Sequence, residues 1–391
     1  MDLVPGYGDQ NNSDFRAHRL MRILSGQEST FTSIKIAEII DDAKSTGLLP
    51  LIATQILKSG EALAAADLEL LNATLRQEIK AEMLRQVEVS RVLGALLKSG
   101  YPAVLCKGTA LAYGLYPWPA SRPRGDTDLL IADKSLDLLP QVFEMLNYKQ
   151  APSTAVTRQW TFFRTDEFGL DHSFDIHWRI SNRARYENAI TFSEARATAQ
   201  ALPIMGSAAW AMSPELALLH ACIHLMGHHA GSRRLIWFYD IVLLLRNFSE
   251  NQLEDFLHAM EQKNVAKECA VAISMTERLF GPLMHARRLK QMWPELETIG
   301  YPRETGLEKT FWDDLGFLSW GGRLTFLART LFPNKNYMYE RYGLTSPYAI
   351  LSLPLLYFFR ITKGCQMHFW RAIWPSADYA SGTPTISQPK K

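Results

Sequence analysis

The sequence has little cysteine and almost no excess charge. Its 391 residues include four cysteines, which lie far apart and form no Cys-x-x-Cys motif. Neither a disulfide framework nor a zinc knuckle is therefore indicated, and we expect a reducing, cytoplasmic location. The formal net charge is only +2. No general basic surface favours bulk nucleic-acid binding, which leaves only local basic clusters.

The sequence also lacks a recognisable leader and a long apolar run. The N-terminal MDLVPGYGDQNNSDFRAH has no basic segment followed by an apolar one, so we expect no signal peptide. The most apolar segment, SPYAILSLPLLYFF (346–359), contains Pro354 and is followed by Arg360. It is too short for a transmembrane span and predicts a buried or interfacial helix pair, with peripheral membrane contact as the lesser alternative.

What is present indicates a globular α+β protein. Hydrophobic residues make up 47% and charged residues 21% of the chain, and its length suits about two to three domains. Helical spacing surrounds one segment in which short apolar runs alternate with turn residues. The pattern predicts a polar lead-in (1–30), N-terminal helices (31–100), a small α/β core (101–182), a helical C-terminal region (183–374) and a disordered tail (375–391).

The predicted core contains carboxylates on its strands. The expected strands lie in YPAVLCKG (101–108), DTDLLIAD (126–133), QWTFFRT (159–165) and SFDIHWRI (173–180). Asp126 and Asp128 are two residues apart, so a strand points both to one face with Cα atoms roughly 6.5 Å apart. Such like charges are tolerated when they are solvated, neutralised by Arg122 and Arg124, or bridged by a divalent cation.

A third carboxylate, Asp175, favours the metal interpretation. It stands in an apolar strand, where a carboxylate is costly unless it is paired or bound to metal, and it shares a face with His177. Transfer chemistry with two metals needs carboxylates that hold Mg²⁺ ions about 3.5–4 Å apart. We therefore predict that Asp126, Asp128 and Asp175 bind two Mg²⁺ ions, with Mn²⁺ as a possible substitute and His177 as an accessory residue.

The segment before these carboxylates predicts a phosphate-binding turn. An apolar strand ends at Lys107, Gly108 permits close backbone approach, and Thr109 begins a helix. Backbone N–H groups at such a helix start, together with the Thr109 hydroxyl, suit phosphate oxygens. Arg122 has two interpretations, an ion-pair partner or a triphosphate clamp, because its guanidinium suits both.

These motifs resemble an uncharacterised bacterial nucleotidyltransferase family within the polymerase-β-like superfamily. The resemblance is carried by KGTALAYGLYPWPASRPRGDTDLLIAD (107–133) and FDIHW (174–178). Further similarity lies in LLHACIHLMGHH (218–229), RRLIWFYDIVLLLR (233–246) and LFPNKNYMYERYG (331–343). The likeness places Gly108 and Thr109 at the end of the superfamily's Gly-Gly-Ser-type turn. It also places Asp126 and Asp128 in the Asp-x-Asp motif, and Asp175 as the later carboxylate. Lys107 replaces the first glycine of that turn, although Lys-Gly is usual in this family.

The resemblance implies a Mg²⁺-dependent nucleotidyltransferase. It would move a nucleoside monophosphate from an NTP, such as ATP, to an unidentified acceptor (small molecule, peptide or RNA) and release pyrophosphate. One alternative is a catalytically silent nucleotide-binding or scaffolding protein, which the Lys107 replacement keeps open. Another is an antibiotic- or toxin-type transferase.

Four polar residues of the helical region have a plainer interpretation. His220, His224 and His228 recur every four residues, so they share one helix face and suggest a metal stripe. The surrounding Leu, Ala and Met pattern instead favours packed or interface histidines. Asp240, within WFYDIVLLL, is interpreted as a buried hydrogen-bond acceptor between helices rather than a catalyst.

Overall fold

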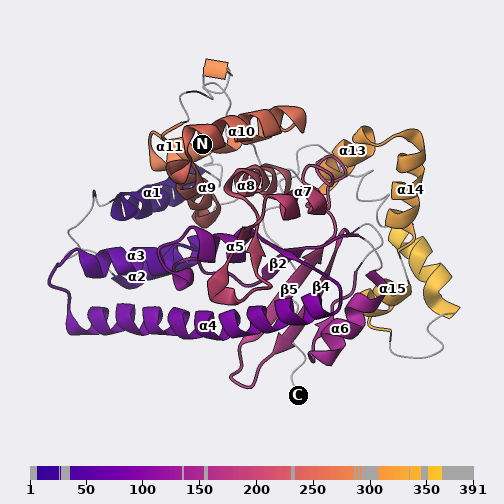
Figure 1. Cartoon of the computed structure of the whole chain (residues 1–391), viewed down its shortest axis with the longest axis horizontal. Helices are drawn as coiled ribbons and strands as arrows, with labels where there is room; N and C mark the ends of the chain where they lie inside the picture. The colour runs from indigo at the N-terminus through magenta and orange to yellow at the C-terminus, as the bar shows by residue number, and fades with distance from the viewer. Residues whose placement is uncertain are drawn as a thin grey trace, which may run out of the picture.

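One mixed sheet with helices on both sides forms the centre of the molecule (Figure 1). The computed structural model describes residues 7–25, 27, 36–133, 136–153, 157–229, 234–285, 288, 291–292, 307–333, 335–344 and 351–362. The α+β fold class is thereby confirmed. The predicted disordered tail, 375–391, lies outside the described residues.

Within those ranges, seven strands join in the order β3-β4-β5-β2-β1-β7-β6. They are β1 (Val104–Cys106), β2 (Thr127–Leu130), β3 (Lys149–Gln150), β4 (Gln159–Thr165), β5 (Asp171–His177), β6 (Gln200–Ala201) and β7 (Trp210–Ala211). β2 runs parallel to β5 and β1 parallel to β7, and the other neighbours are antiparallel. The sheet therefore extends past residue 182, into the region that we expected to be helical. Strands of two residues are too short to produce a periodic pattern.

The helices of the N-terminal half include one that we did not predict. They are α1 (Tyr7–Leu24), α2 (Ile36–Thr46), α3 (Leu49–Lys58), α4 (Ala65–Lys98), α5 (Lys107–Gly114) and α6 (Leu139–Met145). The predicted polar lead-in contains α1, where Leu20 and Ile23 are buried despite the polar composition. Gly47 separates α2 from α3 with a φ of +80°, and a Cβ there would lie 2.9 Å from Ile236. Only glycine suits that turn.

The C-terminal half is mostly helical, as predicted. Its helices are α7 (Phe192–Ala197), α8 (Pro214–His228), α9 (Leu235–Asn247), α10 (Glu250–Gln262), α11 (Ala266–Phe280), α13 (Leu307–Phe317), α14 (Trp320–Leu331) and α15 (Lys335–Arg341). The apolar segment 346–359 was predicted to be buried or interfacial; burial does not fit its described part, where Leu351 and Leu355 are 78% and 70% exposed, and the interfacial alternative stays a prediction. No described helix is long and apolar enough to cross a membrane.

Strand alternation divides the apolar interior into two cores. Val104, Cys106 and Leu130 pack in the core that contains α8, α9 and the N-terminal helices. Leu105 and Leu129 point to the opposite face and pack in the core that contains α4 and α6. Because neighbouring side chains of a strand point to opposite faces, the even-numbered Asp128 faces the α8 side.

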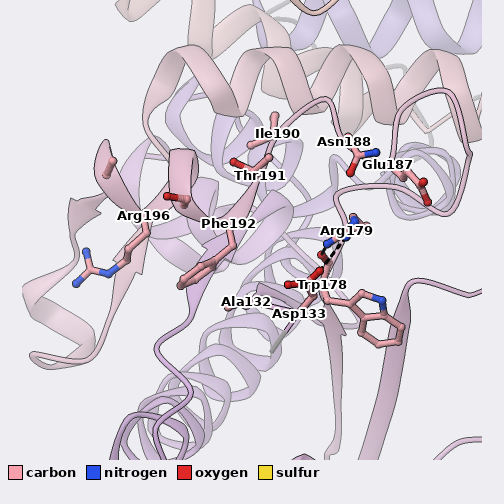
Figure 2. A pocket seen from close by; sticks show the side chains of 12 residues that line it. Ala132, Asp133, Trp178, Arg179, Glu187, Asn188, Ile190, Thr191, Phe192 and Arg196 are labelled. Atoms are coloured by element: carbon pink, nitrogen blue, oxygen red, sulfur yellow. Dashed lines mark hydrogen bonds and ion pairs between the residues drawn. The ribbon is translucent and has the colours of Figure 1, made fainter. Parts of the chain in front are cut away.

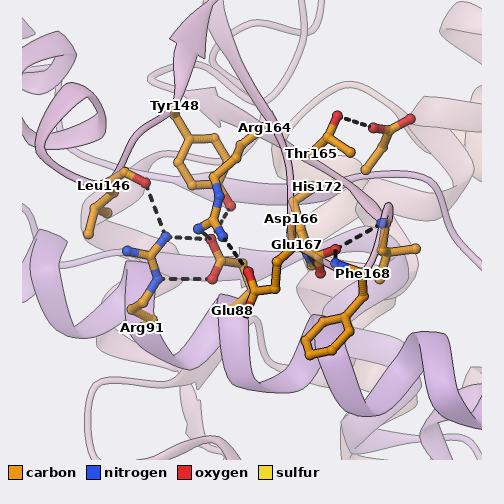
Figure 3. A network of polar contacts seen from close by, with 12 residues as sticks. Glu88, Arg91, Leu146, Tyr148, Arg164, Thr165, Asp166, Glu167, Phe168 and His172 are labelled. Atoms are coloured by element: carbon orange, nitrogen blue, oxygen red, sulfur yellow. Dashed lines mark hydrogen bonds and ion pairs between the residues drawn. The ribbon is translucent and has the colours of Figure 1, made fainter.

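A polar network fastens α4 to the sheet (Figure 3). The Glu88 carboxylate accepts hydrogen bonds from Arg91 at 2.6 and 2.9 Å, from Tyr148 at 2.6 Å and from Arg164 at 3.0 Å. These charge-assisted bonds join the long helix to the loop before β3 and to β4. They hold β4 and the start of β3 against α4.

Candidate active site

The turn between β1 and α5 has an unusual backbone. Lys107 has a φ of +48°, in the left-handed region that glycine favours. A side chain there costs about 1–2 kcal/mol. From this strained position the Lys107 ammonium contacts Asp128, with Nζ 2.7 Å from Oδ1.

Asp128 lies at the centre of a charged cluster. It is the register partner of Asp175 on the adjacent parallel strand β5, so the two carboxylates stand side by side. Its Oδ1 also accepts a hydrogen bond from Nε2 of His177 at 2.9 Å. Burial opposes ionisation, but the Lys107 charge and the His177 hydrogen bond outweigh it and lower the pKa of Asp128.

The other two predicted carboxylates, Asp175 and Asp126, have environments that differ from that of Asp128. Asp175 accepts hydrogen bonds from Thr161 Oγ1 at 2.6 Å and from Gln159 Nε2 at 3.0 Å. Asp126 precedes β2 and lines the cavity described below. Burial, followed by the charges of Asp128 and Asp175, raises the pKa of Asp126 to about 6. Sequence reasoning missed Gln159 and Thr161, although their alternation in QWTFFRT would have put both on one strand face.

The cluster has donors suited to a divalent ion. One ligand atom each from Asp128, Asp175 and His177 lies within 4.8 Å of the others, and Asp126 lies outside this group. Carboxylate oxygens are the donors that Mg²⁺ and Mn²⁺ prefer. Since Nε2 of His177 donates to Asp128, the imidazole positions that carboxylate in this structure. The Lys107 ammonium against Asp128 also shows that the donor set attracts a cation.

Two of the predicted phosphate-binding residues have contacts that we did not foresee. Thr109 is only 1% exposed, and its hydroxyl accepts a hydrogen bond from Nε of Arg124 at 2.9 Å instead of facing the cavity. A Cβ on Gly108 would lie 2.9 Å from Nη1 of Arg122. The glycine therefore permits close approach of a guanidinium, where we had expected phosphate.

Arg122 forms an ion pair, one of its two predicted interpretations. Its Nη2 lies 2.6 Å from Oδ2 of Asp240, and Tyr116 donates to the same carboxylate at 2.7 Å. Asp240 is thus a buried acceptor, although its partners come from the 115–122 segment rather than from another helix. Arg124 pairs with Glu82 of α4 through bonds of 2.7 and 2.8 Å. Arg122 and Arg124 therefore pair with acids outside the carboxylate cluster. Lys107 contacts the cluster directly through Asp128 and neutralises part of its charge.

A cavity of about 290 Å³ joins this cluster to α8 and α9. Its lining includes Lys107, Gly108, Arg122, Asp126 and Asp128, together with His220, His224, His229 and Trp237. The expected helix-packing role fits His220, which is 4% exposed, but the same ring also borders the cavity. No metal cluster within the described residues includes these histidines. Sequence reasoning missed His229 and Trp237 because no local pattern marks them.

A second cavity of about 820 Å³ lies beyond the carboxyl ends of β2 and β5 (Figure 2). Arg179 and Asp133 meet there with Nη2 and Oδ2 2.8 Å apart, and Trp178, Phe192 and Arg196 line the same space. None of the predicted site residues borders it.

Residues 32–281 match the model of a family described as "Uncharacterised nucleotidyltransferase". The chain belongs to this nucleotidyltransferase family. No curated protein matches the chain. A solved structure, "Crystal structure of JHP933 from Helicobacter pylori", is similar at a TM-score of 0.32 and 17% identity, over 57% of this chain and 97% of that one. Family membership thus gives the reaction class, nucleotidyl transfer.

Proposed function

We propose that this protein is a Mg²⁺-dependent transferase that moves a nucleoside monophosphate from an NTP to an acceptor and releases pyrophosphate. Family membership supports the reaction class. The observation that carries the proposal is the side-by-side placement of Asp128 and Asp175 on parallel strands beside a cavity with basic residues. The acceptor (small molecule, peptide or RNA) is unidentified, and ATP is one of the candidate donors.

The acidic residues would hold the divalent ions. Asp128 and Asp175 are the proposed shared ligands, and Asp126 is the proposed third carboxylate. Two Mg²⁺ ions, or Mn²⁺ in their place, would stabilise negative charge on the transferring phosphate. His177 holds Asp128 in position, and Thr161 and Gln159 orient Asp175.

The basic residues would bind the phosphates. Lys107 presents its ammonium at the carboxylates, and the first turn of α5 after Gly108 would offer backbone N–H groups. Thr109 supports this turn from inside through Arg124, and Arg122 borders the cavity. In the reaction, the acceptor oxygen bonds to the α-phosphorus while the bond to the bridging β-phosphate oxygen breaks. Pyrophosphate leaves, and the acceptor proton passes to solvent.

The test is pyrophosphate release with each NTP and Mg²⁺ in the presence of candidate acceptors. Asp128→Asn keeps the side-chain shape and removes the charge, so the variant should fold and lose at least about 1000-fold of the rate, roughly 4 kcal/mol. Asp137→Asn, at an exposed position, is the matched control. Near-normal turnover of Asp128→Asn would refute the metal assignment. NTP binding by the parent without pyrophosphate release from any acceptor would favour the silent nucleotide-binding alternative.

A further inference from the structure

The helical side of the active-site cavity is built from aromatic rings. His220 and His224 come from α8, His229 follows it, and Trp237 comes from α9. All four border the same cavity as Lys107. We call these four residues the aromatic wall.

The rings of the aromatic wall contact one another. Trp237 and His229 have ring centroids 4.2 Å apart and an angle of 36° between their planes. His224 meets Trp237 at 5.3 Å and 90°, and meets His229 at 4.6 Å and 56°. His224, His229 and Trp237 are each only partly buried. Trp237 and His229 therefore form a tilted stack and His224 stands edge-on to Trp237, while each of the three rings remains partly exposed beside the cavity.

The aromatic wall is uncharged. Burial, followed by the positive charge of Lys107, lowers the pKa values of His220, His224 and His229. A neutral imidazole has one N–H donor and one nitrogen acceptor. The wall can thus stack on a planar ring and form hydrogen bonds with its edge. The helical side also carries a positive charge, because Arg234 lines the cavity with its guanidinium 5.4 Å from the centroid of the Trp237 ring.

The two sides of the cavity consequently suit the two ends of one ligand. A charged group with several oxygens fits the Lys107 side, and an uncharged planar heterocycle fits the opposite side. A nucleotide has both ends. We propose that the aromatic wall binds the nucleobase of the NTP, with the base against Trp237 and His229 and its edge bonded by His224. This inference rests on the proposed function, because that function supplies the NTP.

The test compares two ligands that share the phosphate end. Binding of Mg²⁺-NTP, for all four bases, and of Mg²⁺-tripolyphosphate is measured by calorimetry on the full chain. Since stacking of a base on an aromatic ring contributes strongly to affinity, Trp237→Leu should raise the NTP Kd at least about tenfold. Tripolyphosphate affinity should change less than about twofold, because this ligand has no base. Trp320→Leu, at a 79% exposed tryptophan of α14, is the matched control and should change neither affinity.

A second variant separates ring loss from misfolding. His229→Ala removes a partly exposed ring and should also weaken NTP binding selectively, while His258→Ala at an exposed position of α10 should not. Circular dichroism verifies the fold of each variant. The assignment is overturned if the Trp237 and His229 variants bind NTP like the parent, or lose NTP and tripolyphosphate equally. If the parent binds tripolyphosphate as tightly as every NTP, the base assignment is overturned and the proposed function is not. If the parent binds neither ligand, the proposed function fails and the assignment fails with it.

Discussion

The two sides of the active-site cavity are stabilised by different interactions. On the sheet side, Lys107 bonds to Asp128 at 2.7 Å, and Arg122 bonds across the cavity to Asp240 of α9 at 2.6 Å. On the helix side, the rings of the aromatic wall are neutral and contact each other, and the Arg234 guanidinium lies over the Trp237 ring at 5.4 Å. Charged groups need a partner of opposite sign when they are buried, whereas imidazoles can lose their charge instead. The stability of the sheet side therefore depends on its ion-pair partners, and the stability of the helix side depends on pH.

The largest effect is expected where the two sides are joined, at the Arg122–Asp240 ion pair. The two side chains are 7% and 5% exposed. Asp240→Asn leaves the guanidinium buried without a carboxylate, so the free energy of unfolding should fall by about 3–5 kcal/mol. Urea denaturation measures it, with Asp255→Asn at an exposed position of α10 as the control. A loss of less than about 1 kcal/mol would show that the pair contributes little to joining the two sides.

A smaller effect is expected from Lys107 itself. Lys107→Met keeps the length of the side chain but removes the ammonium that faces three carboxylates. The free energy of unfolding without divalent ions should fall by about 1.5–3 kcal/mol, the usual contribution of a hydrogen bond to a charged group. Millimolar Mg²⁺ should restore part of this loss, because the ion supplies the missing positive charge. The measurement is urea denaturation with and without Mg²⁺, beside Lys98→Met at an exposed position of α4. Equal loss in both conditions would contradict a metal site at Asp128.

The smallest effect concerns the pH dependence of the aromatic wall. Burial, followed by the Lys107 charge, lowers the pKa of His220 well below its usual 6.5. Below pH 6.5 the unfolded chain therefore binds a proton that the folded chain does not, and stability falls with falling pH. Between pH 7.5 and 5.5 this one group should remove about 1.4 kcal/mol from the free energy of unfolding.

His220→Gln should remove that share of the pH dependence, since glutamine does not titrate. Urea denaturation of parent and variant at both pH values gives the difference, and His258→Gln, at an exposed position of α10, is the control. Identical pH dependence of parent and His220→Gln would show that His220 is protonated as easily in the folded protein as in the unfolded chain.

Local patterns in the sequence were enough to place two of the three carboxylates, whereas Asp126, which was expected on the strand, precedes β2. Apolar runs and alternation predicted the segments of β1, β2, β4 and β5, and with them the strand positions of Asp128 and Asp175. These signals work because a strand with one polar face repeats every two residues. β6 and β7 have two residues each, too few for a repeat, so the predicted core stopped short of its last strands. The metal and nucleotide roles of the predicted site residues stay predictions.

The choice of partners was decided by the tertiary structure alone. The sequence determined that a buried guanidinium needs a carboxylate, but not which one. Arg122 pairs with Asp240 at a sequence separation of 118 residues, and Arg124 pairs with Glu82 at a separation of 42. The sequence likewise placed His220 and His224 on one helix face, since residues four apart on a helix are neighbours. It could not determine what that face meets. Only the packing of α8 beside α5 and α9 turned the face toward Lys107, because long-range contacts carry no local periodicity.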